Sequence, residues 1–134
     1  MTAELEIRNQ TLGDCLIVRV AGELDLATAP VLRDHVLSQL ALGQTNLVID
    51  LSRVPFLDST GVSALVVAHR EADARGGSVR LAGARRSVRR VFEITRLDRL
   101  FDLHDDVSDA LEAAMGPTGA GTAERGEPTT SAAP

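Results

Sequence analysis

Residues 46–65 read Asn-Leu-Val-Ile-Asp-Leu-Ser-Arg-Val-Pro-Phe-Leu-Asp-Ser-Thr-Gly-Val-Ser-Ala-Leu, and this stretch predicts a strand, a short loop and a helix. Its apolar run Leu47-Val48-Ile49 is rich in β-branched residues. Such a run fits a short strand that is buried on both faces of a parallel or mixed sheet. Asp50 closes this strand, and Pro55 interrupts any further ladder because proline has no backbone N–H to donate.

The helix is expected to begin at the turn Asp58-Ser59-Thr60-Gly61, because the apolar residues after this turn recur at helical spacing. Asp58 suits the N-cap, since its carboxylate can accept a backbone N–H that the first turn leaves unpaired. Ser59 and Thr60 would then lie in the first turn of the helix. Such a position holds a hydroxyl group at the surface on a rigid base.

Most chemistries that could use a serine at this place need a pattern that the sequence lacks. The nucleophile elbow of α/β hydrolases needs Gly-x-Ser-x-Gly, and only Gly61 matches because position 57 is Leu. A phosphate-binding loop needs a lysine, and the chain has none. Aspartic proteases place a glycine two residues after the catalytic aspartate, where this chain has Thr60. A serine nucleophile also needs a base, and no local motif marks any of the three histidines as one.

The remaining interpretation is that Ser59 is modified by another enzyme. Phosphorylation would add a charge of about −1.5 to −2 beside Asp58, and a helix N-terminus can tolerate that charge through its dipole and free N–H groups. A partner docked over the same place would instead meet repulsion and desolvation. Ser63 and Val67 fall on the helix face next to Ser59, which makes Val67 a candidate partner contact. The site is therefore predicted to be a switch.

The strand and the turn, together with two further segments, resemble the STAS domain. This family includes the bacterial anti-sigma factor antagonists and the cytoplasmic ends of sulfate transporters. The segments that carry the resemblance are residues 20–25, 47–51, 56–61 and 91–98. The similarity extends from about residue 5 to about residue 115, which is nearly everything outside the C-terminal tail.

The resemblance implies roles for individual residues. In antagonists of this family the serine after the aspartate is phosphorylated by a partner anti-sigma kinase, and here that position is Ser59. Many relatives carry a second serine where this chain has Thr60, which leaves Thr60 as an alternative acceptor. The acids that match Glu23 and Asp25 lie near the phosphoacceptor in the family, although from the residues alone both can equally be solvated acids in a loop. The expected partner-binding residues are Glu23, Asp25, Asp58, Thr60, Gly61, Ser63 and Val67.

The function that the resemblance implies is that of an anti-sigma factor antagonist, which acts by reversible binding and not by catalysis. The unphosphorylated form would bind an anti-sigma factor and release a sigma factor. The anti-sigma kinase would phosphorylate Ser59 and end the binding, and a metal-dependent serine phosphatase would reset it. ATP belongs to the kinase, so no cofactor is expected here. Two alternatives stay open: a non-catalytic STAS scaffold subunit of a stress-sensing or lipid-transport assembly, and a hydrolase that uses Ser59.

Composition narrows the class and the compartment. The chain has 134 residues, enough for one core, and its net charge of −5 disfavours binding that depends on neutralising nucleic-acid phosphates. The start lacks the basic and apolar regions of a signal peptide, and no run approaches the roughly 18 apolar residues of a membrane span. Cys15 is the single cysteine. We therefore expect a cytoplasmic protein without a membrane segment, a disulfide or a metal site.

The whole sequence predicts a single α/β domain over residues 1–115, with a mixed, mostly parallel sheet of four to five strands and about four helices. Strands are expected near residues 5–9, 15–20, 47–51 and 79–82, with a short one within 97–103. The first two should pair antiparallel, and the later alternation of strand and helix indicates right-handed crossovers. Residues 116–134 are rich in Gly, Pro, Thr, Ser and Ala, and they are expected to form a disordered tail.

The last two predicted helices carry uneven charge. The helix after Gly83 has a basic face made of Arg85, Arg86, Arg89 and Arg90. With three Phe and no Trp or Tyr, the chain has no aromatic platform for nucleic acid, so a solvated helix face is expected. Acids crowd the start of the final helix, where they favour the helix dipole, and they lack the pattern of a calcium-binding loop. The apolar stripe of that helix is expected at Val107, Leu111 and Met115.

Overall fold

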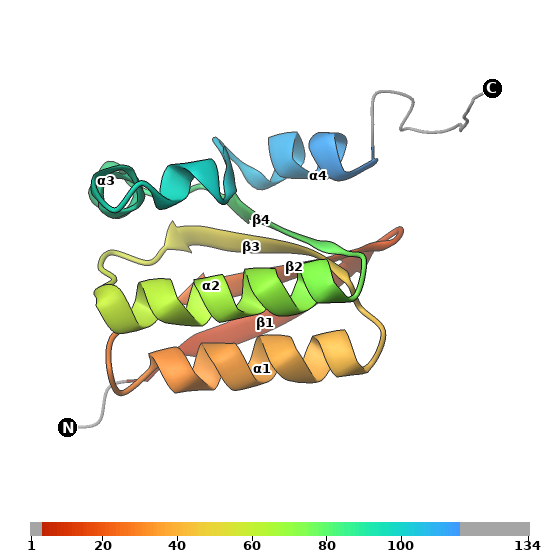
Figure 1. Ribbon diagram of the computed structural model, residues 1–134, viewed down its shortest axis with the longest axis horizontal. Helices are drawn as coiled ribbons and strands as arrows, with labels where there is room; N and C mark the ends of the chain where they lie inside the picture. Colours follow the sequence, from red (N-terminus) through yellow and green to blue (C-terminus); the bar gives the residue numbers. More distant parts are fainter. Residues whose placement is uncertain (1–3, 116–134) are drawn as a thin grey trace.

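The structure, a computed structural model, describes residues 4–115, and this part of the chain forms five strands, four α-helices and one short 3-10 helix. The predicted fold class is therefore confirmed, whereas the predicted tail at 116–134 lies outside the described residues. Figure 1 shows the elements in chain order. They are β1 (Glu6–Leu12), β2 (Cys15–Ala21), α1 (Ala29–Ala41), β3 (Asn46–Arg53), α2 (Ser59–Ala74), β4 (Ser78–Ala82), α3 (Arg86–Ile94), the 3-10 helix η1 (Leu97–Arg99), β5 (Asp102–His104) and α4 (Val107–Met115).

The sheet has the strand order β1-β2-β3-β4-β5, so strands that follow one another in sequence are also neighbours in space. β1 and β2 pair antiparallel, and β2 to β5 run parallel. β3 lies in the middle, and its residues 47–51 are all buried, as expected for a strand covered on both faces. β3 does not end at Asp50 as predicted, because its pairing with β2 continues to Arg53, which lies opposite Ala21. The carboxylate of Asp50 pairs with Arg19 of β2 at 2.8 Å.

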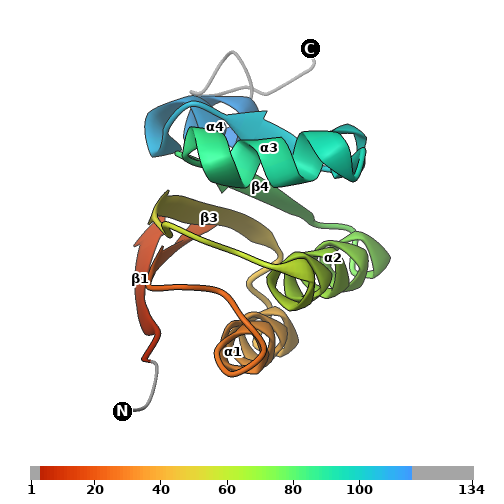
Figure 2. The ribbon, with the colours of Figure 1, turned by 90° about the vertical axis from the view of Figure 1, so that its left-hand side faces the viewer.

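Helices cover both faces of the sheet. Figure 2 shows α1 and α2 side by side on one face and α4 on the other. The larger core lies under α1 and α2, where Leu32, Val36 and Leu40 of α1 are fully buried as their spacing predicts. α3 contributes Val88 and Phe92 to this same core.

The opposite face has a smaller core that differs from the prediction. Ala110 of α4 is its fully buried helical residue, and it packs with Ile17, Val48 and Ala82 of the sheet. The predicted stripe is only partly buried, since Val107 and Leu111 pack at the margin and Met115 is 42% exposed. The small Ala110 side chain fits a helix that lies close to the sheet.

The fold brings the ends of two parallel strands together. β2 ends at Ala21 and leads into the loop before α1, while β3 ends at Arg53 and leads into the turn before α2. Because β2 and β3 are adjacent and parallel, both loops leave the sheet at the carboxyl ends of the strands. In open α/β sheets the carboxyl ends of the strands are the usual place of a binding site.

Candidate functional site

The two loops at the carboxyl ends of β2 and β3 are joined by backbone hydrogen bonds. The N–H of Leu24 donates to the carbonyl of Phe56 at 3.0 Å, and the N–H of Asp58 donates to the carbonyl of Leu24 at 3.1 Å. Leu24 and Leu57 form a parallel bridge, and both side chains are buried. The loop that carries Glu23 is therefore fixed against the start of α2.

Gly61 allows the first turn of α2 to approach this loop closely. A Cβ atom at this position would lie 2.8 Å from the carbonyl oxygen of Leu24 and 2.9 Å from the Cβ of Leu24. Carbon atoms pack at about 3.5–4.0 Å, so no larger residue fits without displacing the backbone. Gly61 is buried and thus has a packing role in the site that its place in the Asp58–Gly61 turn did not reveal.

Asp58 is the N-cap of α2, as predicted. Its Oδ1 accepts the backbone N–H groups of Thr60 at 2.9 Å and of Gly61 at 3.2 Å. Ser59 is the first residue of the helix and is exposed. Within the described part of the chain, the hydroxyl of Ser59 has no hydrogen-bond partner, so the site presents a free hydroxyl on a fixed backbone.

The hydroxyl of Thr60 has a different environment from that of Ser59. Thr60 is half-buried, and its Oγ1 donates a hydrogen bond to Oδ1 of Asp58. This hydroxyl, followed by the N–H groups of Gly61 and Thr60, holds the pKa of the Asp58 carboxyl below its usual range, while desolvation opposes the shift. The Asp58 carboxylate is therefore ionised at neutral pH, directly beside Ser59.

Glu23 and Asp25 lie in the neighbouring loop and differ in what they contact. The Oδ1 of Asp25 accepts the N–H groups of Ala27 at 3.0 Å and of Thr28 at 3.1 Å. The hydroxyl of Thr28 donates to the carbonyl of Glu23, which closes the turn before α1. The carboxylate of Asp25 is thus engaged in shaping the loop, whereas the side chain of Glu23 is exposed.

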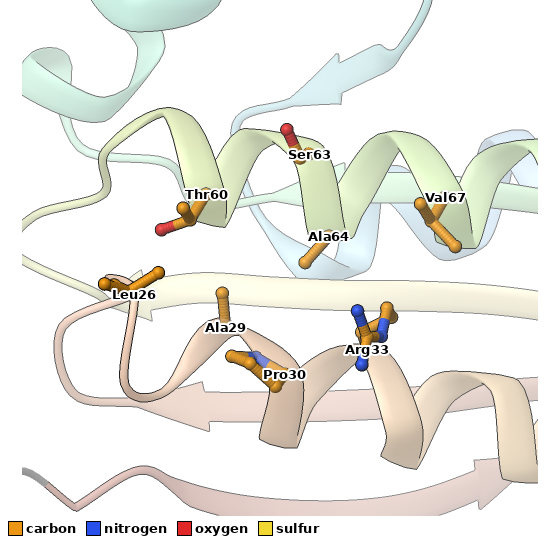
Figure 3. Close-up of a pocket in the computed structure, with 8 residues that line it drawn as sticks. All are labelled: Leu26, Ala29, Pro30, Arg33, Thr60, Ser63, Ala64 and Val67. Carbon is orange, nitrogen blue, oxygen red and sulfur yellow. The ribbon is translucent and has the colours of Figure 1, made fainter.

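A groove of about 230 Å³ lies between α1 and α2 next to the Ser59 turn (Figure 3). Most of the side chains that line it are apolar or small. They are Leu26, Ala29, Pro30, Arg33, Thr60, Ser63, Ala64 and Val67. The side chains at its rim stand out into solvent, since Leu26 is 77% exposed and Val67 is 39% exposed. We call this feature the α1–α2 groove.

The structure brings three of the predicted residues, Thr60, Ser63 and Val67, to one wall of the α1–α2 groove. Sequence reasoning missed the other wall, which the residues before and within α1 supply. Leu26 offered a signal, because it is a large apolar residue that directly follows Asp25 and lies outside the buried stripe of α1. Arg33 gave no signal beyond that of an ordinary helix-surface charge.

The histidines give the hydrolase alternative no support. The Nε2 of His35 lies 2.9 Å from the amide oxygen of Asn9, and His69 packs edge-on to Phe101 with ring centroids 5.4 Å apart. No histidine hydrogen-bonds to Ser59 within residues 4–115. Residues 4–115 contain no group of three or more His, Cys, Asp or Glu side chains that could hold a metal ion. None of the helices described combines the length and the apolar character needed to cross a membrane.

Comparison with known proteins gives a consistent result. The family model of the STAS domain matches residues 6–110. The chain is 37% identical to the anti-sigma-F factor antagonist RsfB of Mycobacterium tuberculosis over 102 residues. This match covers 75% of this chain and 81% of RsfB. The chain is also 37% identical to the anti-sigma-B factor antagonist of Bacillus subtilis over 86 residues, 64% of this chain and 78% of the relative.

A solved structure agrees with these sequence matches. An anti-sigma factor antagonist from Mycobacterium paratuberculosis has a TM-score of 0.78 and 31% identity, with 84% of this chain and 96% of that chain covered. The matched residues 6–110 contain both loops of the site and the first turn of α2. In sequence and in fold, the chain belongs to the STAS domain family, and the relatives compared here are anti-sigma factor antagonists.

Proposed function

We propose that this chain binds an anti-sigma factor through the Ser59 turn and the α1–α2 groove, and that phosphorylation of Ser59 ends the binding. The observation that carries the proposal is an exposed Ser59 hydroxyl on a capped helix, directly beside an apolar groove that Thr60 also lines. The relatives named as anti-sigma factor antagonists supply the class of partner. Capture of the anti-sigma factor would free a sigma factor.

A phosphate on Ser59 would change the charge of the surface while leaving the domain folded. It would carry about −1.5 to −2 charges and lie next to the ionised Asp58. The dipole of α2 tolerates a negative charge at its N-terminus, where the N–H groups of Thr60 and Gly61 already bind the Asp58 carboxylate. A partner seated over the same turn would have to desolvate the phosphate beside a carboxylate. Weakening the complex a hundredfold takes about 2.8 kcal/mol, which one buried and unpaired charge can supply.

The α1–α2 groove supplies the attractive part of the interface. Binding energy in protein interfaces concentrates in a few apolar anchors that a polar rim shields from water. Leu26 and Val67 are exposed apolar side chains at the groove. Glu23, in the loop before α1, and Ser59, at the start of α2, are exposed polar residues. Asp25 contributes by holding the loop that presents Glu23.

The other parts of the proposed cycle rest on the resemblance to the antagonist family. The anti-sigma factor acts as the serine kinase and brings the ATP, and a metal-dependent serine phosphatase removes the phosphate. The chain itself acts without catalysis and without a cofactor. It works in the cytoplasm, where sigma factors meet RNA polymerase.

The test uses calorimetry with the anti-sigma factor from the same host. Wild type and Ser59→Ala should bind alike, while Ser59→Asp should bind at least about tenfold more weakly because the carboxylate adds an unpaired charge to the interface. Ser38→Asp is the matched control, since Ser38 is an exposed residue of α1 outside the groove. It should bind as wild type does. Equal affinities of Ser59→Ala and Ser59→Asp would contradict the proposal that phosphorylation of Ser59 ends the binding.

A scaffold function predicts a different set of results. In that case wild type and Ser59→Asp would both remain in one stable assembly when purified from the host. Ser59 would also carry no phosphate in the cells from which the assembly is isolated. Mass spectrometry of the purified material distinguishes the two functions directly.

A further inference from the structure

The charges of the last third of the described chain are strongly segregated. Residues 85–99 contain six arginines and two acidic residues, a formal net charge of +4 in a chain whose total is −5. Residues 102–112 contain five acidic residues and neither lysine nor arginine, a formal net charge of −5. A basic segment is therefore followed by an acidic segment whose net charge is opposite in sign and similar in magnitude.

The fold places these two segments on opposite faces of the sheet at one edge. The basic segment forms α3, which packs through Val88 and Phe92 into the core beneath α1 and α2. The acidic segment forms β5 and α4, and α4 packs through Ala110 on the other face. β5 is the last strand of the sheet, next to β4. Figure 2 shows α3 and α4 together at the end of the molecule away from α1.

Most charges at this edge are not neutralised within the described chain. Two ion pairs involve these segments, Arg89–Asp105 at 3.4 Å and Arg80–Asp102 at 3.8 Å. Arg86 and Arg90 have no ion-pair partner in residues 4–115, and they line an open groove of about 500 Å³ whose other charged residues are Arg89, Glu93 and Asp105. Arg86 and Arg90 are one helical turn apart, where like charges repel and destabilise a helix. A partner of opposite charge would relieve that repulsion.

The acidic helix and the nearby apolar side chains complete this surface. Asp109 and Glu112 of α4 are exposed, and neither has an ion-pair partner among the residues that the structure describes. Ile94, the last residue of α3, is 72% exposed, and Leu100, just after η1, is 37% exposed. The edge thus offers a basic patch and an acidic patch of complementary charge, together with two exposed apolar side chains.

We propose that a second copy of this chain covers this edge, with α3 of each copy against α4 of the other. A two-fold axis along the β5 edge, parallel to the strands, exchanges the two faces of the sheet, so α3 of each copy lies on the same side of the joined sheets as α4 of the other. An isologous contact requires this kind of self-complementary surface. A separate acidic partner would neutralise α3 alone and leave the acids of α4 unpaired. The contact uses no residue of the Ser59 site and is independent of the proposed function.

Charge reversal provides a specific test. Arg86→Glu with Arg90→Glu reverses α3, and Asp109→Arg with Glu112→Arg reverses α4. Each double variant alone has like charges in both contacts of its dimer. An equimolar mixture of the two has opposite charges in both contacts. The matched control combines Arg53→Glu with Arg70→Glu. It changes the net charge by the same amount as the α3 variant, at exposed arginines outside this edge.

Sedimentation velocity of the full chain, at up to about 500 μM, detects dimers with a Kd below the millimolar range. Wild type and the control should dimerise, and more weakly in about 500 mM than in about 50 mM salt because salt screens exposed charges. Each reversed variant, with folding verified by circular dichroism, should have a Kd at least about tenfold higher, and the mixture should regain dimerisation. A monomeric wild type, or a mixture that stays monomeric, would overturn the proposal. So would an acidic protein that binds Arg86 and Arg90 while the chain itself remains monomeric.

Discussion

The hydroxyl of Thr60 donates a hydrogen bond to the same carboxylate oxygen of Asp58 that accepts the backbone N–H of Thr60. This contact separates two hydroxyl groups that are neighbours in sequence. Thr60 is half-buried and bound to the helix cap, whereas Ser59 is exposed and unbound within the described residues. One side chain therefore serves the structure of the turn and the other is available to an enzyme or a partner.

Thr60→Val should raise the pKa of Asp58 toward the ordinary value for aspartate. The variant keeps the shape of the side chain and removes the hydroxyl that contributes most to lowering this pKa. NMR titration of the Asp58 carboxyl carbon measures the shift directly, and Thr60→Ser, which keeps a hydroxyl, should titrate close to wild type. An unchanged Asp58 pKa in Thr60→Val would mean that the backbone N–H groups alone account for the depression.

The same shift should alter stability in acid. The folded-state pKa of Asp58 lies below its unfolded value, so the stabilisation it provides is complete above the unfolded pKa and is lost as the pH falls through the folded pKa. In Thr60→Val the folded-state pKa should lie closer to the unfolded value, so the loss should be smaller and complete at a higher pH. Urea denaturation of both proteins between about pH 5 and pH 2, a range that spans the ordinary aspartate pKa and extends below it, shows whether the two stability profiles separate.

Ser59→Ala should accept no phosphate from the anti-sigma kinase, even though Thr60 remains. The Thr60 hydroxyl would have to leave Asp58 and become exposed before a kinase could use it. Intact-mass spectrometry after incubation with kinase and ATP should find one phosphate on wild type and none on Ser59→Ala. Thr60→Val is the matched control and should still accept one phosphate. Phosphate on Thr60 in the Ser59→Ala protein would show that the contact with Asp58 opens readily.

The sequence predicted those features that local signals encode. The β-branched run in β3 and the aspartate before Ser59 depend on neighbouring residues alone, so the strand, the cap and the start of α2 at Ser59 were predictable. The end of β3 was not, because it depends on the pairing of Arg53 with Ala21 of β2, which is far away in sequence. The burial of Ala110 was missed for a related reason, since apolar periodicity marks large side chains and not a close helix–sheet contact.

The site followed the same rule. The spacing of Ser63 and Val67 predicted that they share one helix face, and both line the α1–α2 groove. Its α1 side was missed, because the groove exists only where two separate helices meet. The hydrogen bonds that join Leu24 to the turn before α2 also connect distant segments and leave no local pattern.

Gly61→Ala should destabilise the protein, although alanine favours a helix over glycine by about 1 kcal/mol. The new Cβ would lie 2.8 Å from the carbonyl oxygen of Leu24, a backbone atom held by its own hydrogen bond from Asp58. Overpacking of this kind costs about 1–3 kcal/mol, and we expect it to exceed the gain in helix propensity. Chemical denaturation measures the difference, with Ser63→Ala on the exposed face of α2 expected within about 0.5 kcal/mol of wild type. A Gly61→Ala protein as stable as wild type would show that the Leu24 loop yields.

Leu26→Ala should weaken binding to the anti-sigma factor without affecting stability. Leu26 is 77% exposed at the rim of the α1–α2 groove, and Leu42, at the far end of α1, is 75% exposed and lines no part of that groove. Truncation of either should change the free energy of unfolding by no more than about 0.5 kcal/mol. Calorimetry should find a loss of about 1–2 kcal/mol in binding for Leu26→Ala, roughly fivefold to thirtyfold in Kd, and none for Leu42→Ala. This pair carries no charge change, so it tests the groove separately from the phosphate. If both bind as wild type does while Ser59→Asp binds weakly, the partner contacts the Ser59 turn without using the groove.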